Sequence, residues 1–193
     1  MLISPIHLRT LAETLDLAGH PSREVLAVAG LSPEALDPQG PWVPEEWLDQ
    51  LMCAAQTATG NPAYGLSVST SLALTRYGPH ALLVIQAPTL RHALHDIRYF
   101  APLLVEQPEM DVSEQGGDAW LSVRPLGTTP EGKRFRTEWL MSLAVQMARR
   151  TGAMTGTARA FDPLPMTLTK SISPIGALSR VIDKASEMRR PAP

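Results

Sequence analysis

The main pattern in the first sixty residues is a spacing of three and four between apolar positions, in segments that each end at a glycine. This spacing places the apolar side chains on one face of a helix, and glycine suits the left-handed residue that closes one. The pattern predicts helices over 5–19, 21–30 and 44–60. A single helical turn is expected over 32–36, with Ser32 as its N-cap.

The middle of the chain continues the helical pattern. A short helix is expected over 61–68. The continuous apolar run Ala81–Ile85 has no period of its own, and we interpret it as a buried helix. Thr89 stands directly before the most regular apolar stripe of the chain, which extends to Leu104, and is expected to cap that helix. Another long helix is expected over 136–150.

Two extended segments predict a β-hairpin, with strands over 105–113 and 118–126 around a turn at 115–117. Pro108 in the first of them favours a position at a sheet edge. Residues 163–170 can form one more extended stretch. Together these elements predict an α+β fold, a helix-rich single domain with a small antiparallel sheet.

Charge is distributed unevenly along the chain. Residues 1–156 hold 11 basic and 16 acidic side chains, whereas residues 157–193 hold 6 basic and 3 acidic ones. A change of sign of this kind indicates a boundary. We therefore expect one domain over 1–156 and a C-terminal tail over 157–193, with one amphipathic helix in that tail.

Composition narrows the possible partners and compartments. The net charge of −2 offers no general attraction to nucleic acid or to anionic membrane, and no apolar run reaches the length of a membrane span. Cys53 is the only cysteine, so no intramolecular disulfide can form. The first residues do not resemble a signal peptide. We expect a cytoplasmic protein that binds neither DNA nor membrane by itself.

No catalytic or cofactor motif emerges, so we expect a protein that is not an enzyme and holds no metal or cofactor. His92, His95 and Asp96 have helical spacing that can serve a metal, but they lie off the apolar stripe, and a solvated helix face explains them better. Cys53 is a candidate nucleophile. Its apolar neighbours favour the alternative of a small buried hydrophobe.

Two groups of basic residues remain to be explained, Lys133-Arg134-Arg136 and Arg149-Arg150. Neither is paired with aromatic residues in the way that a platform for nucleic acid requires. We interpret both groups as solvated surface.

A set of aromatic and polar residues is suited to a small-molecule pocket, which combines apolar walls with a few polar groups. Ordinary core or rim positions explain each of them as well. The candidate ligand-binding residues are Trp42, Tyr77, His80, Gln86, Tyr99 and Trp120.

Several motifs in a fixed order resemble the N-terminal effector domain of one branch of the AraC-type transcription regulators. They are the run AGLSPEALDP over 29–38, the helix that follows it, GNPAYGL over 60–66, Tyr77-Gly78, and APTLRHAL over 87–94. The similarity extends over about residues 5–152.

The resemblance implies a domain that senses a small-molecule effector and dimerises, as a homodimer or as a heterodimer with a related regulator. The family's DNA-binding region of two helix-turn-helix units has no counterpart here. We therefore expect a bacterial regulator that lacks its DNA-binding part, either as a naturally short protein or as a truncated regulator. The alternative is an orphan interaction module that modulates a full-length regulator. The leading surfaces for association are the apolar stripes of 136–150 and 174–188.

The resemblance also leads us to expect that the family's further strands are missing after residue 152. An unpaired hairpin edge is a liability for aggregation. We expect the stretch Pro165–Lys170 to cover that edge.

Overall fold

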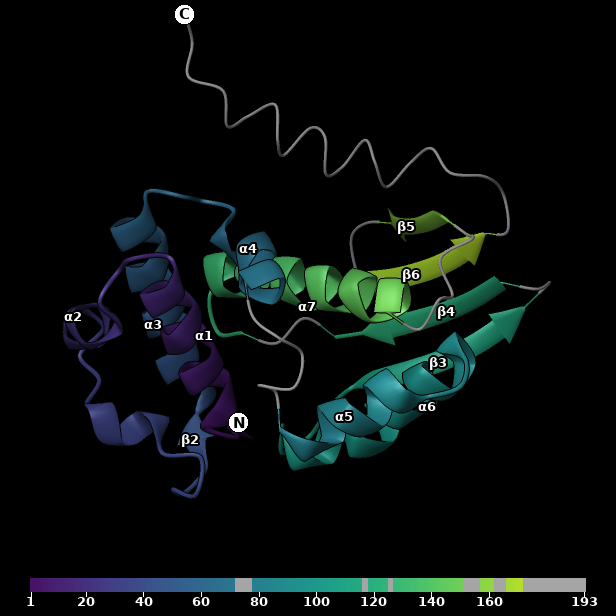
Figure 1. Ribbon diagram of the computed structural model, residues 1–193, viewed down its shortest axis with the longest axis horizontal. Helices are drawn as coiled ribbons and strands as arrows, with labels where there is room; N and C mark the ends of the chain where they lie inside the picture. Colours follow the sequence, from purple (N-terminus) through teal and green to yellow (C-terminus); the bar gives the residue numbers. More distant parts are fainter. Residues whose placement is uncertain (72–77, 116–117, 125–126, 151–156, 162–165, 172–193) are drawn as a thin grey trace, which may run out of the picture.

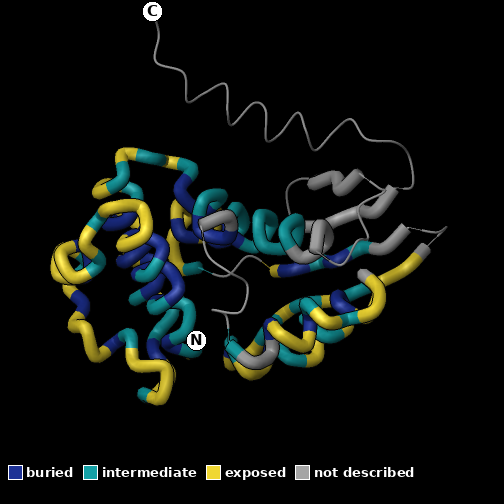
Figure 2. Tube along the Cα trace, in the orientation of Figure 1, coloured by how far each residue is buried: buried dark blue, intermediate teal, exposed yellow. Residues whose placement is uncertain are grey.

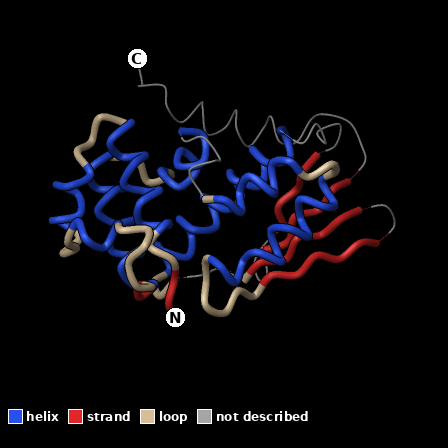
Figure 3. Tube along the Cα trace, turned by 60° about the horizontal axis from the view of Figure 1, so that its bottom comes forward, coloured by secondary structure: helices blue, strands red, loops and turns tan. Residues whose placement is uncertain are grey.

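The computed structural model describes residues 1–71, 78–115, 118–124, 127–150, 157–161 and 166–171. Helices form most of this part, and a four-stranded antiparallel sheet lies at one end of it (Figures 1 and 3). The predicted α+β, helix-rich fold with a small antiparallel sheet is confirmed. The predicted tail helix over 174–188 lies outside the described residues.

The N-terminal part is a group of helices with one short two-stranded ladder. In chain order its elements are β1 Leu2–Ile3, α1 Ile6–Leu17, α2 Ser22–Val28, the 3-10 turn η1 Pro33–Leu36, β2 Val43–Pro44, α3 Glu45–Thr59 and α4 Tyr64–Ser71. Strand β1 pairs antiparallel with β2.

The predicted helix ends in this part are confirmed. Gly19, Gly30 and Gly60 all have positive φ angles, which glycine adopts without strain. Ser32 does precede η1, but its side chain makes no capping hydrogen bond.

The second part carries the sheet and the helices that pack on it. Its elements are α5 Pro79–Gln86, α6 Leu90–Phe100, the 3-10 turn η3 Ala101–Leu103, β3 Met110–Gln115, β4 Asp118–Val123, α7 Pro130–Arg150, β5 Thr157–Phe161 and β6 Met166–Ser171. As predicted, Thr89 caps α6, because its hydroxyl accepts the backbone N–H of His92 at 3.2 Å.

Two predictions for this part need correction. The run Ala81–Ile85 is helical, but its Leu82 and Leu83 are exposed, since only one side of α5 faces the core. Helix α7 begins at Pro130, six residues earlier than expected. The hydroxyl of Thr129 accepts the N–H of Gly132 at 3.0 Å, and Pro130 stands at the first helical position, so this segment is an ordinary helix start.

The core of the molecule lies between α1, α3, α4 and α7. Its fully buried side chains include Leu8, Leu11 and Leu15 of α1 and Leu51 of α3 (Figure 2). A smaller cluster joins the sheet to its helices, because Leu94 of α6 packs with residues of β3 and β4 and with Leu140 of α7. Helices α6 and α7 therefore both pack against the β3–β4 hairpin.

The sheet has the strand order β3-β4-β6-β5, with all neighbours antiparallel. Strand β6 pairs with β4 in the register Val123↔Met166 to Trp120↔Thr169. The expected covering of the hairpin edge by residues 165–170 is thus confirmed. The expectation that the sheet's further strands are missing is wrong, since β5 and β6 supply them. The division into 1–156 and 157–193 stays a prediction.

Gly65 allows α4 to lie close against α7. A Cβ atom at this position would lie 2.6 Å from the backbone oxygen of Phe135, closer than such atoms approach in proteins. Hydrogen bonds join the two helices on either side, from Ser69 Oγ to the Trp139 carbonyl at 3.2 Å and from Ser142 Oγ to the Leu66 carbonyl at 2.9 Å. The absence of a Cβ atom at Gly65 therefore permits this short distance between the helices.

Gly65→Ala is expected to lower the free energy of unfolding by about 1–3 kcal/mol, the usual cost of overpacking a core. The sign is informative, because a change from glycine to alanine inside a helix otherwise gains about 0.5–1 kcal/mol. Urea unfolding measures the difference, and Gly65→Val should lose more than Gly65→Ala. A gain in stability for Gly65→Ala would contradict the close packing.

Candidate functional site

A cavity of about 190 Å³ lies where α6 and α7 meet the β3–β4 hairpin and the N-terminal helices. Most of the side chains that line it are apolar. They are Ile3, Leu48, Ala81, Val84, Ile97, Phe100, Ala101, Leu104, Val105, Pro108, Met110, Leu121, Val123, Trp139, Leu140, Leu143 and Ala144. The polar or charged lining residues are His7, Glu109, Arg124, Arg136 and Thr137.

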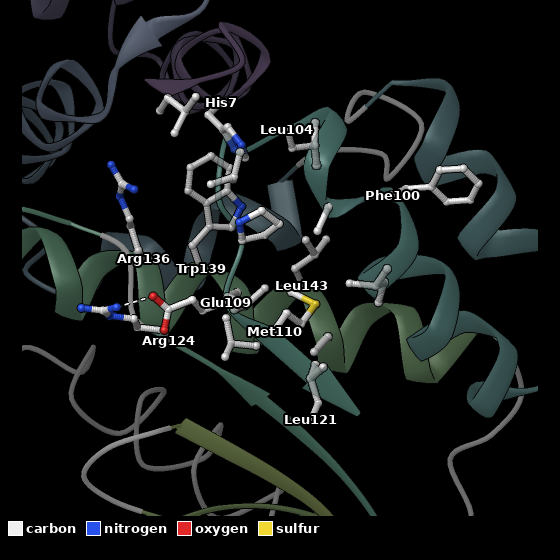
Figure 4. A pocket seen from close by; sticks show the side chains of 18 of the residues that line it. His7, Phe100, Leu104, Glu109, Met110, Leu121, Arg124, Arg136, Trp139 and Leu143 are labelled. Carbon is white, nitrogen blue, oxygen red and sulfur yellow. Dashed lines mark hydrogen bonds and ion pairs between the residues drawn. The ribbon is translucent and has the colours of Figure 1, made fainter. Parts of the chain in front are cut away.

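Helix α7 supplies one wall of this cavity with residues at helical spacing. Arg136, Trp139, Leu140 and Leu143 recur at intervals of three and four, so their side chains share one face of the helix. The ring of Trp139 meets that of His7 edge-on, with centroids 6.1 Å apart. This contact joins α7 to the start of α1 at the cavity (Figure 4).

Arg136 is buried beside the cavity and held by two acidic residues of α3. Its Nη2 donates to the backbone oxygen of Glu45 at 2.9 Å and lies 3.2 Å from Asp49 Oδ1. Its Nη1 lies 3.5 Å from Glu45 Oε2. Burial lowers the pKa of the Arg136 guanidinium, whereas the charges of Asp49 and Glu45 raise it. Arginine stays charged at neutral pH, so this is a buried ion pair.

Asp49 also fixes the start of α7. Its Oδ2 accepts hydrogen bonds from the backbone N–H and the hydroxyl of Thr128, at 2.6 and 2.8 Å. A Cβ on Gly132 would lie 2.5 Å from Asp49 Cγ, so glycine leaves the room that the carboxylate occupies. Through these contacts Asp49 connects α3, the loop before α7 and Arg136.

An exposed ion pair lies at another part of the cavity lining. Arg124, just after β4, binds Glu109, just before β3, through its guanidinium. Their backbones are also joined, by a hydrogen bond from Arg124 N to Glu109 O at 2.9 Å. Both side chains are more than half exposed, so the pair contributes little to stability.

Of the six predicted ligand-binding residues, the structure describes the side chains of four. Tyr77 lies outside the described residues, and of His80 only the backbone is described, at the start of α5. Trp42, Gln86 and Tyr99 are exposed, and Trp120 of β4 is half-buried. These four are not among the residues that line the cavity. Their role in binding a ligand stays a prediction.

Sequence reasoning misjudged two further residues. Arg136 was expected on the solvated surface, but only 8% of it is exposed, because α7 begins earlier and points this residue at α3. Cys53 was expected in the apolar face of α3, but it is exposed. The pKa of its thiol is raised, first by partial burial and then by the charges of Asp49 and Glu131. This shift keeps the thiol protonated.

One sequence signal pointed to the buried ion pair. Asp49 lies between Leu48 and Leu51, in the apolar stripe of α3, where a charged residue needs a partner. The partner itself, Arg136, is 87 residues away in the sequence and is identified only by the fold.

Glu138 of α7 gives the molecule a pH-dependent stability. Desolvation raises the pKa of its carboxyl above the ordinary 4.5, an effect that Arg134 opposes, and its buried Oε2 has no hydrogen-bond partner among the described residues. A carboxyl with a raised pKa in the folded state favours folding below the ordinary pKa. That advantage is lost as the pH rises through the folded value.

Glu138→Gln is therefore expected to raise the free energy of unfolding at pH 7, and the gain should disappear as the pH falls below 4.5. Urea unfolding at pH 4 and pH 7 tests this. The control is Glu131→Gln, at an exposed position in the first turn of the same helix. A Glu138→Gln variant that is less stable than the parent at pH 7 would contradict the assignment.

An apolar cavity with few polar groups, enclosed by helices and a small sheet, is typical of domains that bind small molecules. A family model described as the arabinose-binding domain of AraC transcription regulators, N-terminal, matches residues 19–160. The chain belongs to this family and is a domain of ligand-sensing transcription regulators, as the resemblance implied. A search of the curated proteins finds no match. No helix in the described part of the chain is long and apolar enough to cross a membrane.

Proposed function

We propose that this domain senses a small-molecule effector in the cavity between α6, α7 and the β3–β4 hairpin, and that it acts in the cytoplasm. The family membership supports the sensing role. We choose this cavity as the site because most of its lining side chains are apolar. They come from both halves of the described chain. A molecule bound there contacts α1, α3, α6, α7 and the sheet at once.

Contacts with several elements give a bound effector a means of changing the domain. A ligand shifts an equilibrium only if it binds one arrangement of the elements better than another. The cavity is lined by His7 of α1 on one side and by Leu121 of β4 on the other. Trp139 of α7 also lines the cavity, and its ring contacts that of His7. Filling it would fix the sheet and α6 relative to the N-terminal helices.

We further propose that the domain binds its ligand without transforming it. In support, the charged groups at the cavity are already engaged with each other, Arg136 with Asp49 and Glu45, and Arg124 with Glu109. A general acid or base needs instead a group that can reach the substrate's proton.

A thermal-shift panel tests the site. The probes are L-arabinose, L-arginine, p-cresol and 4-methylbenzoate, each at equal concentration, with the intact chain and with Ala144→Phe, which fills the cavity. Ala58→Phe, at an exposed position of α3, is the matched control. At least one probe should raise the melting temperature of the parent and of Ala58→Phe but not that of Ala144→Phe. A shift that Ala144→Phe retains would place the site elsewhere.

The proposal includes self-association, through a surface that differs from the one expected. Phe135 and Trp139 of α7 are buried within the domain, so these two apolar side chains are not available to a partner. Exposed apolar side chains are found instead on the packed pair α5 and α6 and just after them, at Leu82, Leu83, Tyr99 and Leu103. Exposed apolar groups gathered on neighbouring elements are typical of interaction surfaces.

Sedimentation velocity at tens of micromolar tests this surface. The parent chain should sediment as a dimer, and the double variant Leu83→Glu, Tyr99→Glu as a monomer, because two charges on each copy disfavour burial of the surface. The control carries the same changes away from α5 and α6, at the exposed Leu17 and Val28. A parent that is monomeric throughout the concentration range would contradict the self-association proposal.

A further inference from the structure

We infer that the effector of this domain is an uncharged aromatic or alicyclic molecule with at most one polar group, rather than a sugar. The inference rests on the proposed function, since it specifies the ligand of the same cavity. It departs from the description of the family, which names arabinose. The cavity wall offers apolar contacts and few free polar groups.

A sugar needs a hydrogen-bond partner for almost every one of its oxygen atoms. A buried hydroxyl without such a partner costs about 1–3 kcal/mol, and a pentose has several hydroxyls. Among the described residues that line this cavity, five are polar or charged. The wall therefore has few groups for a pentose to bind.

Most of these polar groups are already engaged within the protein. The Thr137 hydroxyl donates to the Lys133 carbonyl of its own helix at 2.8 Å. The Arg136 guanidinium is held by Asp49 and Glu45, and Arg124 binds Glu109. A sugar could bind these polar groups only by displacing the contacts within the protein. If Arg136 turned to the sugar, the buried carboxylate of Asp49 or Glu45 would lose its ion-pair partner.

Three charged side chains of the wall are gathered at one side of the cavity. In Figure 4, Arg136, Glu109 and Arg124 lie together at one side of the view, whereas Leu121, Leu143 and Phe100 lie toward the other. Such a wall complements a molecule with an apolar body and a single polar end. The thioether of Met110, next to Leu121, adds a polarisable contact that suits an aromatic ring.

The charges at the polar side argue against an anionic ligand. Two guanidinium groups that line the cavity, those of Arg124 and Arg136, are paired with three carboxylates. Glu109 lies in the cavity wall, whereas Glu45 and Asp49 lie behind Arg136. These groups have one more negative charge than positive charges. A carboxylate on the ligand would add a further negative charge beside them. An uncharged hydroxyl or amide at this end avoids that repulsion.

The volume sets the size of the ligand. An apolar cavity of about 150 Å³ in another protein binds benzene, so the cavity of about 190 Å³ here accepts one ring with a short substituent. The free ligand loses its hydration on entering, which favours binding in proportion to its apolar area.

Isothermal titration of the intact chain with p-cresol, 4-methylbenzoate and L-arabinose tests the inference. We expect p-cresol to bind at least about tenfold more tightly than either of the other two, a difference of about 1.4 kcal/mol. Ala144→Phe should weaken p-cresol binding by about tenfold or more, and Ala58→Phe should leave it unchanged. A second variant, Leu143→Ala, is needed in case Ala144→Phe does not fold. Leu143→Ala enlarges the cavity, so this variant should bind the two-ring compound 2-naphthol more tightly than the parent chain does.

The outcomes separate this inference from the proposed function. If L-arabinose or 4-methylbenzoate binds more tightly than p-cresol and loses affinity in Ala144→Phe, the ligand class is wrong while the cavity remains the sensing site. If p-cresol binds equally well to Ala144→Phe and the parent, the inferred site is wrong. If none of the three probes binds, the inference fails, and a shift with L-arginine in the thermal panel would still support the sensing role.

Discussion

Asp49→Ala is expected to lower the free energy of unfolding by about 3–5 kcal/mol, the usual cost of removing one partner from a buried ion pair. Arg136 would keep Glu45 as its acidic neighbour, but it would lose the carboxylate whose Oδ1 lies 3.2 Å from its Nη2. The N–H and hydroxyl of Thr128 would lose their common acceptor as well. An alanine there also leaves a space against Gly132, where the carboxylate now packs.

Urea unfolding of the intact chain measures this loss. The control is Gln50→Ala, at the next position of α3, where the side chain is exposed and a change within about 0.5 kcal/mol is expected. Asp49→Asn should lie between Asp49→Ala and the parent, because the amide keeps the shape and one acceptor but not the charge. A loss below about 1 kcal/mol for Asp49→Ala would show that the pair does not hold α3 to α7.

Ending the chain after Gly156 is expected to expose the edge of β4 and to destabilise the sheet. The shortened chain lacks β5 and β6, so β4 keeps only β3 as a neighbour. A two-stranded hairpin is marginal by itself, although α6 and α7 still pack on this one. Its free edge also presents unpaired N–H and carbonyl groups to other copies of the chain.

Hydrogen exchange compares the intact and shortened chains. The amides of β4 that face β6 should exchange about tenfold faster or more after the truncation. Those of α1 and α3 should change little, because the core residues described around these helices all precede residue 150. Light scattering should show more association of the shortened chain. Unchanged protection of β4 in the shortened chain would contradict the pairing with β6.

The features that sequence patterns predicted well are local. A helix stop at Gly60 depends on the conformational freedom of one residue, and the cap of α6 depends on Thr89 and the third residue after it. Neighbours in the chain fix both, so one segment contains the whole signal. The covering of the hairpin by residues 165–170 was also predicted, from the alternation in that stretch and the exposed edge that needed a partner.

The features that were missed depend on residues far apart in the sequence. The cavity combines His7, Ile97, Leu121 and Trp139, none of which differs in its own segment from an ordinary core residue. The burial of Arg136 follows from the earlier start of α7 and from its position opposite Asp49. Local periodicity contains no information on which helix faces which. For the same reason the six candidate residues were chosen by type, and type does not determine which side chains share a cavity.

The most direct test of the account is a crystal structure of the intact chain with 4-bromophenol, since bromine is located by its anomalous scattering. The central claim is that the cavity between α6, α7 and the hairpin binds a small, uncharged ring compound. The account predicts a bromine peak within van der Waals distance of Ile97, Leu121 and Leu143, with the hydroxyl toward Arg124 and Arg136. Bromine bound only at the outer surface, with the cavity empty at millimolar ligand, would contradict it.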